Sequence, residues 1–92
     1  MDQNLKQDPL NQGGAILDIT MCSLQSVCTL DKFIPPSIQL TTINLSQNML
    51  SVIEGVFSQC KFLRKLDLSV NHIKVIENLK CEQLLELNLS KN

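Results

Sequence analysis

Residues 63–73 read LRKLDLSVNHI, and this stretch decides the fold because its spacing of apolar residues recurs on both sides of it. Its pattern is L-x-x-L-x-L-x-x-N-x-I. The upstream copy consists of Leu40, Ile43, Leu45, Asn48 and Leu50, and the downstream copy of Leu84, Leu87, Leu89 and Asn92. The asparagines of consecutive copies are 23 and then 21 positions apart. A period of this length predicts a stack of similar turns of chain.

The apolar positions in the middle of each copy alternate with polar ones. Leu66 and Leu68 lie on either side of Asp67, and the other copies keep the same order. Because side chains two residues apart point to the same face of a strand, each copy predicts one short strand.

The segments between copies are predicted to contain short helical turns. Four apolar residues have the i, i+3, i+4, i+7 spacing of a helix that packs inward: Ile53, Val56, Phe57 and Cys60. In the next such segment, Ile73, Ile76 and Leu79 step by three, which predicts a 3₁₀ segment.

The first copy is irregular and follows a polar N-terminal segment. Residues 1–14 are rich in Gln, Asn and Asp, so we expect a flexible tail. The alternative is that Leu5 and Leu10 lie over the first repeat as a loose cap. The repeat domain then covers residues 15–92, and its first copy places Leu17, Ile19, Cys22 and Leu24 at the pattern positions and turns inward through Leu30, Phe33 and Ile34.

The pattern L-x-x-L-x-L-x-x-N-x-I-x-x-I-x-x-L of residues 63–79 resembles the leucine-rich repeat superfamily, and the resemblance extends over residues 15–92. It is most similar to the short, about 22-residue class found in intracellular phosphatase regulatory subunits and cilium-associated proteins. The resemblance implies an α/β solenoid of about three and a half repeats. Short parallel strands would line its concave side, with turns and 3₁₀ or short helices on the convex side.

Each well-formed copy carries an asparagine where the strand gives way to a loop. We expect Asn48, Asn71 and Asn92 to form a structural ladder, with their amides bonding the otherwise unpaired backbone of adjacent turns. Cys22 takes this place in the first copy.

The outward strand positions are what a partner would meet. Those that vary between copies carry the most information about the ligand, because the others match the family consensus. We assign partner binding on the concave face to Thr42, Gln47, Lys65, Asp67, Val70, Glu86 and Lys91. The face mixes small polar groups, isolated charges and apolar chains, which favours a protein partner. For any single one of them, the alternative is a solvated strand residue.

The four cysteines have no C-x-x-C spacing and the chain has one histidine, so the sequence predicts no metal site. Cys60 and Cys81 each precede a repeat-opening leucine by three residues. One interpretation is that both are small buried apolar residues. The other is a disulfide between stacked turns, at the Cα separation of about 5.5 Å that such a bond requires.

The chain lacks the features of several function classes. A net charge of −1 and the absence of basic runs interleaved with aromatics exclude a nucleic-acid groove. No stretch approaches the ~20 apolar residues of a membrane span. Asp18 and Asp67 lie on strands two repeats apart, roughly 10 Å, and no catalytic or cofactor-binding motif is present, so we expect neither an enzyme nor a cofactor.

These observations favour a non-catalytic protein interaction module in a scaffold or regulatory-subunit role. One alternative is a ligand-binding fragment of an extracellular leucine-rich repeat receptor or adhesion protein, and another is an appended repeat segment of a larger enzyme. Residues 1–14 lack a secretion signal, so we expect a cytoplasmic protein, cilium-associated by resemblance only. Since the last copy has no polar closing segment, we also expect a truncated domain that self-associates through its open C-terminal end.

Overall fold

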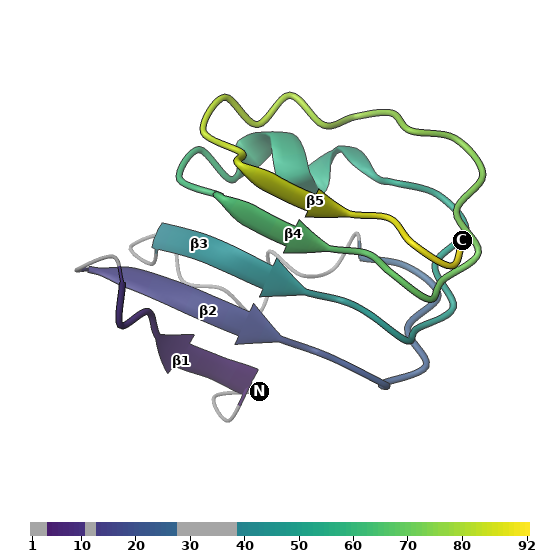
Figure 1. Ribbon diagram of the computed structural model, residues 1–92, viewed down its shortest axis with the longest axis horizontal. Helices are drawn as coiled ribbons and strands as arrows, with labels where there is room; N and C mark the ends of the chain where they lie inside the picture. The colour runs from purple at the N-terminus through teal and green to yellow at the C-terminus, as the bar shows by residue number, and fades with distance from the viewer. Residues whose placement is uncertain (1–3, 11–12, 28–38) are drawn as a thin grey trace.

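The computed structural model describes residues 4–10, 13–27 and 39–92, and a five-stranded sheet forms its centre (Figure 1). In chain order the strands are β1 (Leu5–Gln7), β2 (Gly14–Asp18), β3 (Gln39–Asn44), β4 (Lys65–Asp67) and β5 (Glu86–Asn88). They lie in the same order in space, with β2 to β5 parallel and β1 antiparallel to β2. A strand is thus confirmed in each of the four predicted copies.

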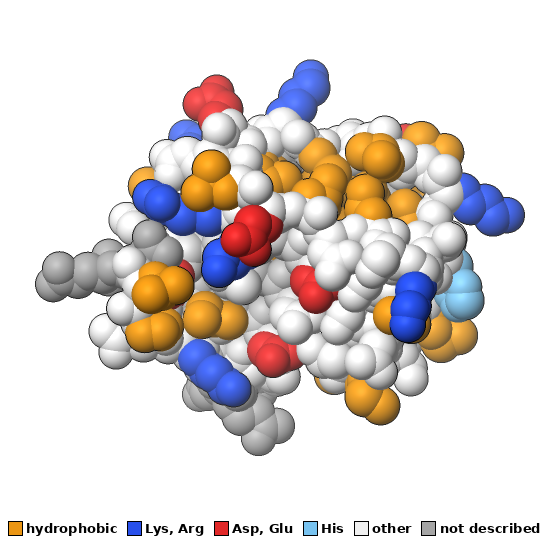
Figure 2. Space-filling model, viewed as in Figure 1, with side chains coloured by type: hydrophobic (Ala, Val, Ile, Leu, Met, Phe, Trp, Pro, Cys, Tyr) orange, Lys and Arg blue, Asp and Glu red, His pale blue; other side chains and the backbone are white. Residues whose placement is uncertain are grey.

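The apolar residues of consecutive copies form a row across the parallel strands. Leu17 pairs with Ile43, Ile43 with Leu66, and Leu66 with Leu87. The first three are buried, whereas Leu87 is 39% exposed. Hydrophobic side chains therefore reach the surface between β5 and the return segment before it (Figure 2).

Backbone pairing continues past the ends of the strands. The Leu45 N–H donates to the Asp67 carbonyl oxygen at 2.8 Å, and the Gln47 N–H donates to the Ser69 carbonyl oxygen at 3.0 Å. The same two bonds join the copies that contain β4 and β5. Because each turn bonds its neighbour over this length, the copies are held in one register.

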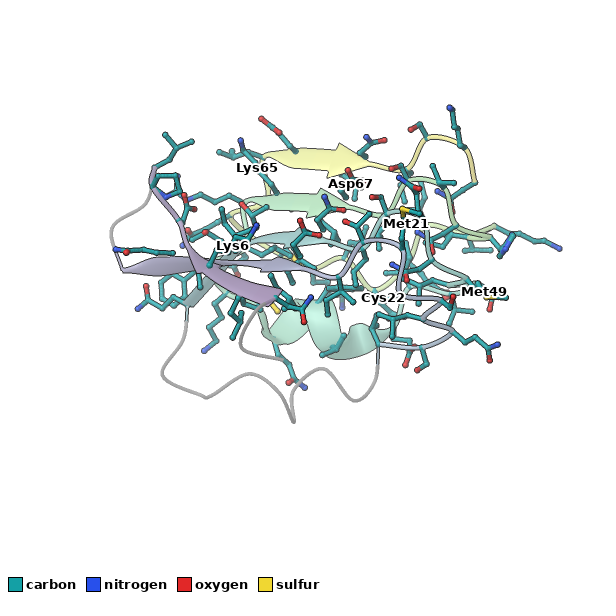
Figure 3. All side chains as sticks on the ribbon, turned by 90° about the horizontal axis from the view of Figure 1, so that it is seen from below. Lys6, Met21, Cys22, Met49, Lys65 and Asp67 are labelled. Carbon is teal, nitrogen blue, oxygen red and sulfur yellow. The ribbon has the colours of Figure 1, made fainter. Side chains whose placement is uncertain are left out.

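The predicted helical turn after β3 is confirmed as a 3₁₀ helix, η3 (Gly55–Gln59), which lies behind the sheet (Figure 3). Ile53 and Phe57 are buried, as the spacing predicts. The N-cap residue Glu54 makes no side-chain capping bond. Its Oε1 instead accepts bonds from the Ser26 hydroxyl at 2.7 Å and the Val27 N–H at 2.9 Å, so this carboxylate ties η3 to the preceding repeat.

The 3₁₀ segment predicted from Ile73, Ile76 and Leu79 is wrong. Residues 72–80 have no helical structure, and Ile76 is 69% exposed instead of packing inward. Asn78 anchors this return segment, because its Nδ2 donates to the Ile53 carbonyl oxygen at 2.8 Å. A side-chain bond therefore ties this segment to the return segment of the preceding repeat.

In the described residues of the N-terminal segment, 4–10 and 13–14, the structure differs from the expected flexible tail. Leu5–Gln7 forms β1, and Leu5 packs against the core while Leu10 is exposed. Asp8 is buried, and its Oδ2 accepts a bond from the Thr41 hydroxyl of β3. β1 pairs with β2 through backbone hydrogen bonds, and Asp8 bonds β3. These interactions offset the loss of conformational entropy when the segment becomes ordered.

The inward turn predicted at Leu30, Phe33 and Ile34 lies outside the described residues.

Candidate functional site

The sheet face opposite η3 carries two rows of outward side chains. The first row follows the strand register from Lys6 through Ile16, Thr42 and Lys65 to Glu86. The structure thus brings three of the predicted binding residues together on neighbouring strands. Lys6 extends the row, and the sequence analysis missed it because it lies in the segment expected to be a tail.

The second row consists of Asp18, Asn44, Asp67 and Asn88. In each, the side-chain Oδ1 accepts a bond from the backbone N–H two residues later, at 2.9 to 3.2 Å. This local turn fixes the side chain at the end of its strand. In the described part of the chain, neither Asp67 Oδ2 nor Asn44 Nδ2 makes a hydrogen bond, so these atoms are free to bond a partner.

A shallow hollow of about 370 Å³ lies over these rows. Its lining includes four of the predicted binding residues, Thr42, Lys65, Asp67 and Glu86, together with Asn44 and Asn88. Lys65 Nζ lies 3.9 Å from Glu86 Oε1, and both side chains are exposed. Lys65 and Asp67 lie on the side of the sheet away from η3 (Figure 3).

The other three predicted binding residues, Gln47, Val70 and Lys91, are exposed and lie on turns beyond the strands. Their φ angles are +59°, +54° and +59°, and Met21 has the same conformation at +57°. The left-handed region is unfavourable for a β-branched residue, so Val70 is held there by the bonds of the turns around it. The repeat pattern shows this column, but not its backbone conformation.

Asn48, Asn71 and Asn92 lie where the pattern predicts, at the ends of the paired segments. Asn71 Nδ2 donates to the carbonyl oxygens of Leu45, Leu68 and Ser69 at 3.0 to 3.1 Å. Its Oδ1 accepts the Leu50 N–H at 3.0 Å. Asn48 and Asn92 bond the preceding copy in the same way.

Cys22 reproduces part of this arrangement in the first copy. Its Sγ donates to the Thr20 carbonyl oxygen at 3.4 Å, which corresponds to the bond from Asn71 to Ser69. The thiol is exposed and makes no bond to another turn among the described residues.

Among the residues that the structure describes, no group of three or more His, Cys, Asp or Glu side chains is placed to hold a metal ion. Within the same residues, no helix is long and apolar enough to span a bilayer.

Comparison with known proteins gives one family and one relative. The family model for the leucine-rich repeat matches residues 16–73. The zebrafish (Danio rerio) protein "Transforming growth factor beta activator LRRC33" is 39% identical over 54 residues, which are 59% of this chain and 8% of that protein. This chain therefore spans a small part of the length of that relative. No solved structure matches the chain. Since the family model covers more than half of the sequence and the four copies form neighbouring parallel strands, the chain belongs to the leucine-rich repeat family.

Proposed function

We propose that this chain is a non-catalytic interaction module that holds a protein partner on the sheet face opposite η3. Leucine-rich repeats act in protein–protein interaction, which supports the class of function. The observation that carries the proposal is the alignment of Thr42, Lys65 and Glu86 across three strands, over a hollow of about 370 Å³. We further infer that the repeats wind as a solenoid with this face on its concave side.

The chemistry of the face fits a protein surface of mixed character. The ion pair between Lys65 and Glu86 is exposed, so it contributes little to stability and its partners can pair instead with charges on another protein. Val70 adds an apolar contact at the strand ends, where it is 41% exposed. Such a combination offers charged groups together with a small apolar contact.

The test compares two double variants in affinity capture with quantitative mass spectrometry. Lys65→Glu with Val70→Asp reverses one charge and removes one apolar contact on the proposed face. Lys61→Glu with Val52→Asp makes the same changes in a return segment and serves as the control. The exposed fraction of Val52, 48%, is similar to the 41% of Val70.

We expect the first variant to lose at least one partner that the control and the unmodified chain retain. A purified partner should then bind the first variant at least tenfold more weakly, which corresponds to about 1.4 kcal/mol. Identical partner lists for all three proteins would contradict binding through this face.

The compartment of this module is a separate proposal. We propose a cytoplasmic scaffold or regulatory subunit, because the repeats resemble the short class found in phosphatase regulatory subunits and cilium-associated proteins. The alternative is the ligand-binding part of an extracellular receptor or adhesion protein, and the similarity to a protein named as a transforming growth factor beta activator favours it. Protease treatment of intact cells that carry the natural protein separates the two, because only an extracellular module is digested.

A further inference from the structure

Cys60 and Cys81 occupy equivalent places in consecutive repeats. The Leu63 N–H donates to the Cys60 carbonyl oxygen at 3.2 Å, and the Leu84 N–H donates to the Cys81 carbonyl oxygen at 3.1 Å. The same tight turn therefore precedes β4 and β5, which are paired neighbours. Equivalent residues of adjacent strands are about 4.8 Å apart, which lies within the range of about 4.4 to 6.8 Å between the Cα atoms of a disulfide.

The two sulfur atoms contact the same helix. Cys60 Sγ lies 3.8 Å from the Val56 carbonyl oxygen, and Cys81 Sγ donates to the Phe57 carbonyl oxygen at 3.1 Å. The thiol of the later repeat thus reaches back onto η3, where the thiol of the earlier repeat already lies. Burial raises the pKa of the Cys60 thiol, and negative charge on Cys81 raises it further.

Cys22 does not share this place. It is exposed, it bonds Thr20 of its own turn, and it lies beyond the far ends of the strands (Figure 3). Its thiol therefore serves as an internal comparison.

We propose that Cys60 and Cys81 are an oxidation site that forms a disulfide between consecutive repeats. The bond would close residues 60–81 into a loop that contains β4 and the return segment after it. That return segment has no helix, and its apolar residues Val75 and Ile76 are exposed. A bond at Cys81 would fix the end of this segment against η3, where the Ser58 hydroxyl also donates to the Asn78 carbonyl oxygen.

The chemistry balances with glutathione disulfide as the oxidant. The Cys81 thiolate attacks one sulfur of glutathione disulfide and releases a glutathione thiolate. The Cys60 thiolate then attacks the Cys81 sulfur of the mixed disulfide and releases the second. The two thiol protons end on two molecules of glutathione.

The raised pKa of both thiols sets the speed of this reaction. At neutral pH few of these groups are thiolates, so attack is slow. The pair is therefore suited to a lasting bond in an oxidising compartment, as in the extracellular alternative above, and not to rapid redox sensing.

The experiment incubates the folded 92-residue chain with glutathione disulfide, blocks the remaining thiols, and maps tryptic peptides by mass spectrometry. Trypsin separates the relevant cysteines, because Cys60 falls in peptide 33–61, Cys81 in peptide 81–91, and Cys22 in peptide 7–32. We expect a linked pair of peptides 33–61 and 81–91. The thermal midpoint should rise by about 10 °C on oxidation and return when the bond is reduced.

Cys60→Ser should abolish both effects, whereas Cys22→Ser should retain them. Peptides 33–61 and 81–91 recovered unlinked from the unmodified chain would overturn the proposal, as would their linkage to peptide 7–32. The unmodified chain alone decides the matter if the Cys60→Ser protein does not fold.

Discussion

Leu66 and Leu87 are register partners on β4 and β5, but Leu66 is 1% exposed and Leu87 39%. They have the same residue type at the same pattern position, and they differ in whether a further turn covers them. Leu66→Ala should lower the free energy of unfolding by about 3 kcal/mol, because it leaves a cavity in a packed layer. Leu87→Ala should cost about 1 kcal/mol or less. Urea denaturation measures both, and equal losses would contradict this account of the layers.

Asn71→Ala should lower the free energy of unfolding by about 1 to 3 kcal/mol. The substitution leaves the Leu50 N–H and the carbonyl oxygens of Leu45 and Leu68 without their side-chain partner in a buried place. Asn92→Ala is the matched control, because Asn92 has the same bonding pattern at an exposed position and should cost less. A thermal midpoint unchanged by Asn71→Ala would count against the ladder as a source of stability.

Removal of the ion pair between Lys65 and Glu86 should leave stability nearly unchanged. Both side chains are solvent-exposed, so water screens their attraction. We expect Lys65→Met to change the free energy of unfolding by no more than about 0.5 kcal/mol, as measured by urea denaturation at low and high salt. A larger, salt-dependent loss would show that the pair helps to hold β4 and β5 together.

The two half-buried thiols predict a loss of stability in alkali. Burial raises the pKa of Cys60 and Cys81 above the ordinary value of 9.0, so the folded chain keeps protons that the unfolded chain releases. This contribution is fully present below pH 9.0 and is lost as the pH rises through the folded-state pKa values. For the reduced chain, the free energy of unfolding should fall above pH 9.0, and less steeply in the Cys60→Ala, Cys81→Ala double variant. The same slope in both proteins would assign the loss to other groups.

The apolar surface beside β5 predicts self-association. Ile76 is 69% exposed there, and an uncovered apolar layer favours contact with another chain. Ile76→Lys should weaken association at least tenfold in sedimentation velocity. Met21→Lys is a control of equal exposure, at 70%, at the other end of the stack. A chain that stays monomeric at all concentrations would refute the prediction.

The sequence predicts well what depends on the repeat itself. The alternation around Leu66 places a strand there, and the recurrent asparagines lie at the strand ends where the pattern puts them. These features follow from spacing alone, because every copy must bury the same face in the same way.

What the sequence does not predict depends on contacts between unlike segments. The steps of three through Ile76 indicate an inward 3₁₀ turn, but the bond from Asn78 to Ile53 takes its place. The polar composition around Asp8 indicates a tail, but one hydrogen bond to Thr41 and pairing with β2 order it. Composition and periodicity contain no information about such single long-range bonds.

The reversed direction of β1 has a consequence for how this architecture could be enlarged. A new turn placed before β2 would need the edge that Leu5–Gln7 already occupies in the opposite direction, whereas β5, among the described residues, is paired only with β4 and runs in the common direction. Gene duplication could therefore add units between β2 and β5 or beyond β5, but it could not add them on the N-terminal side without first displacing that strand.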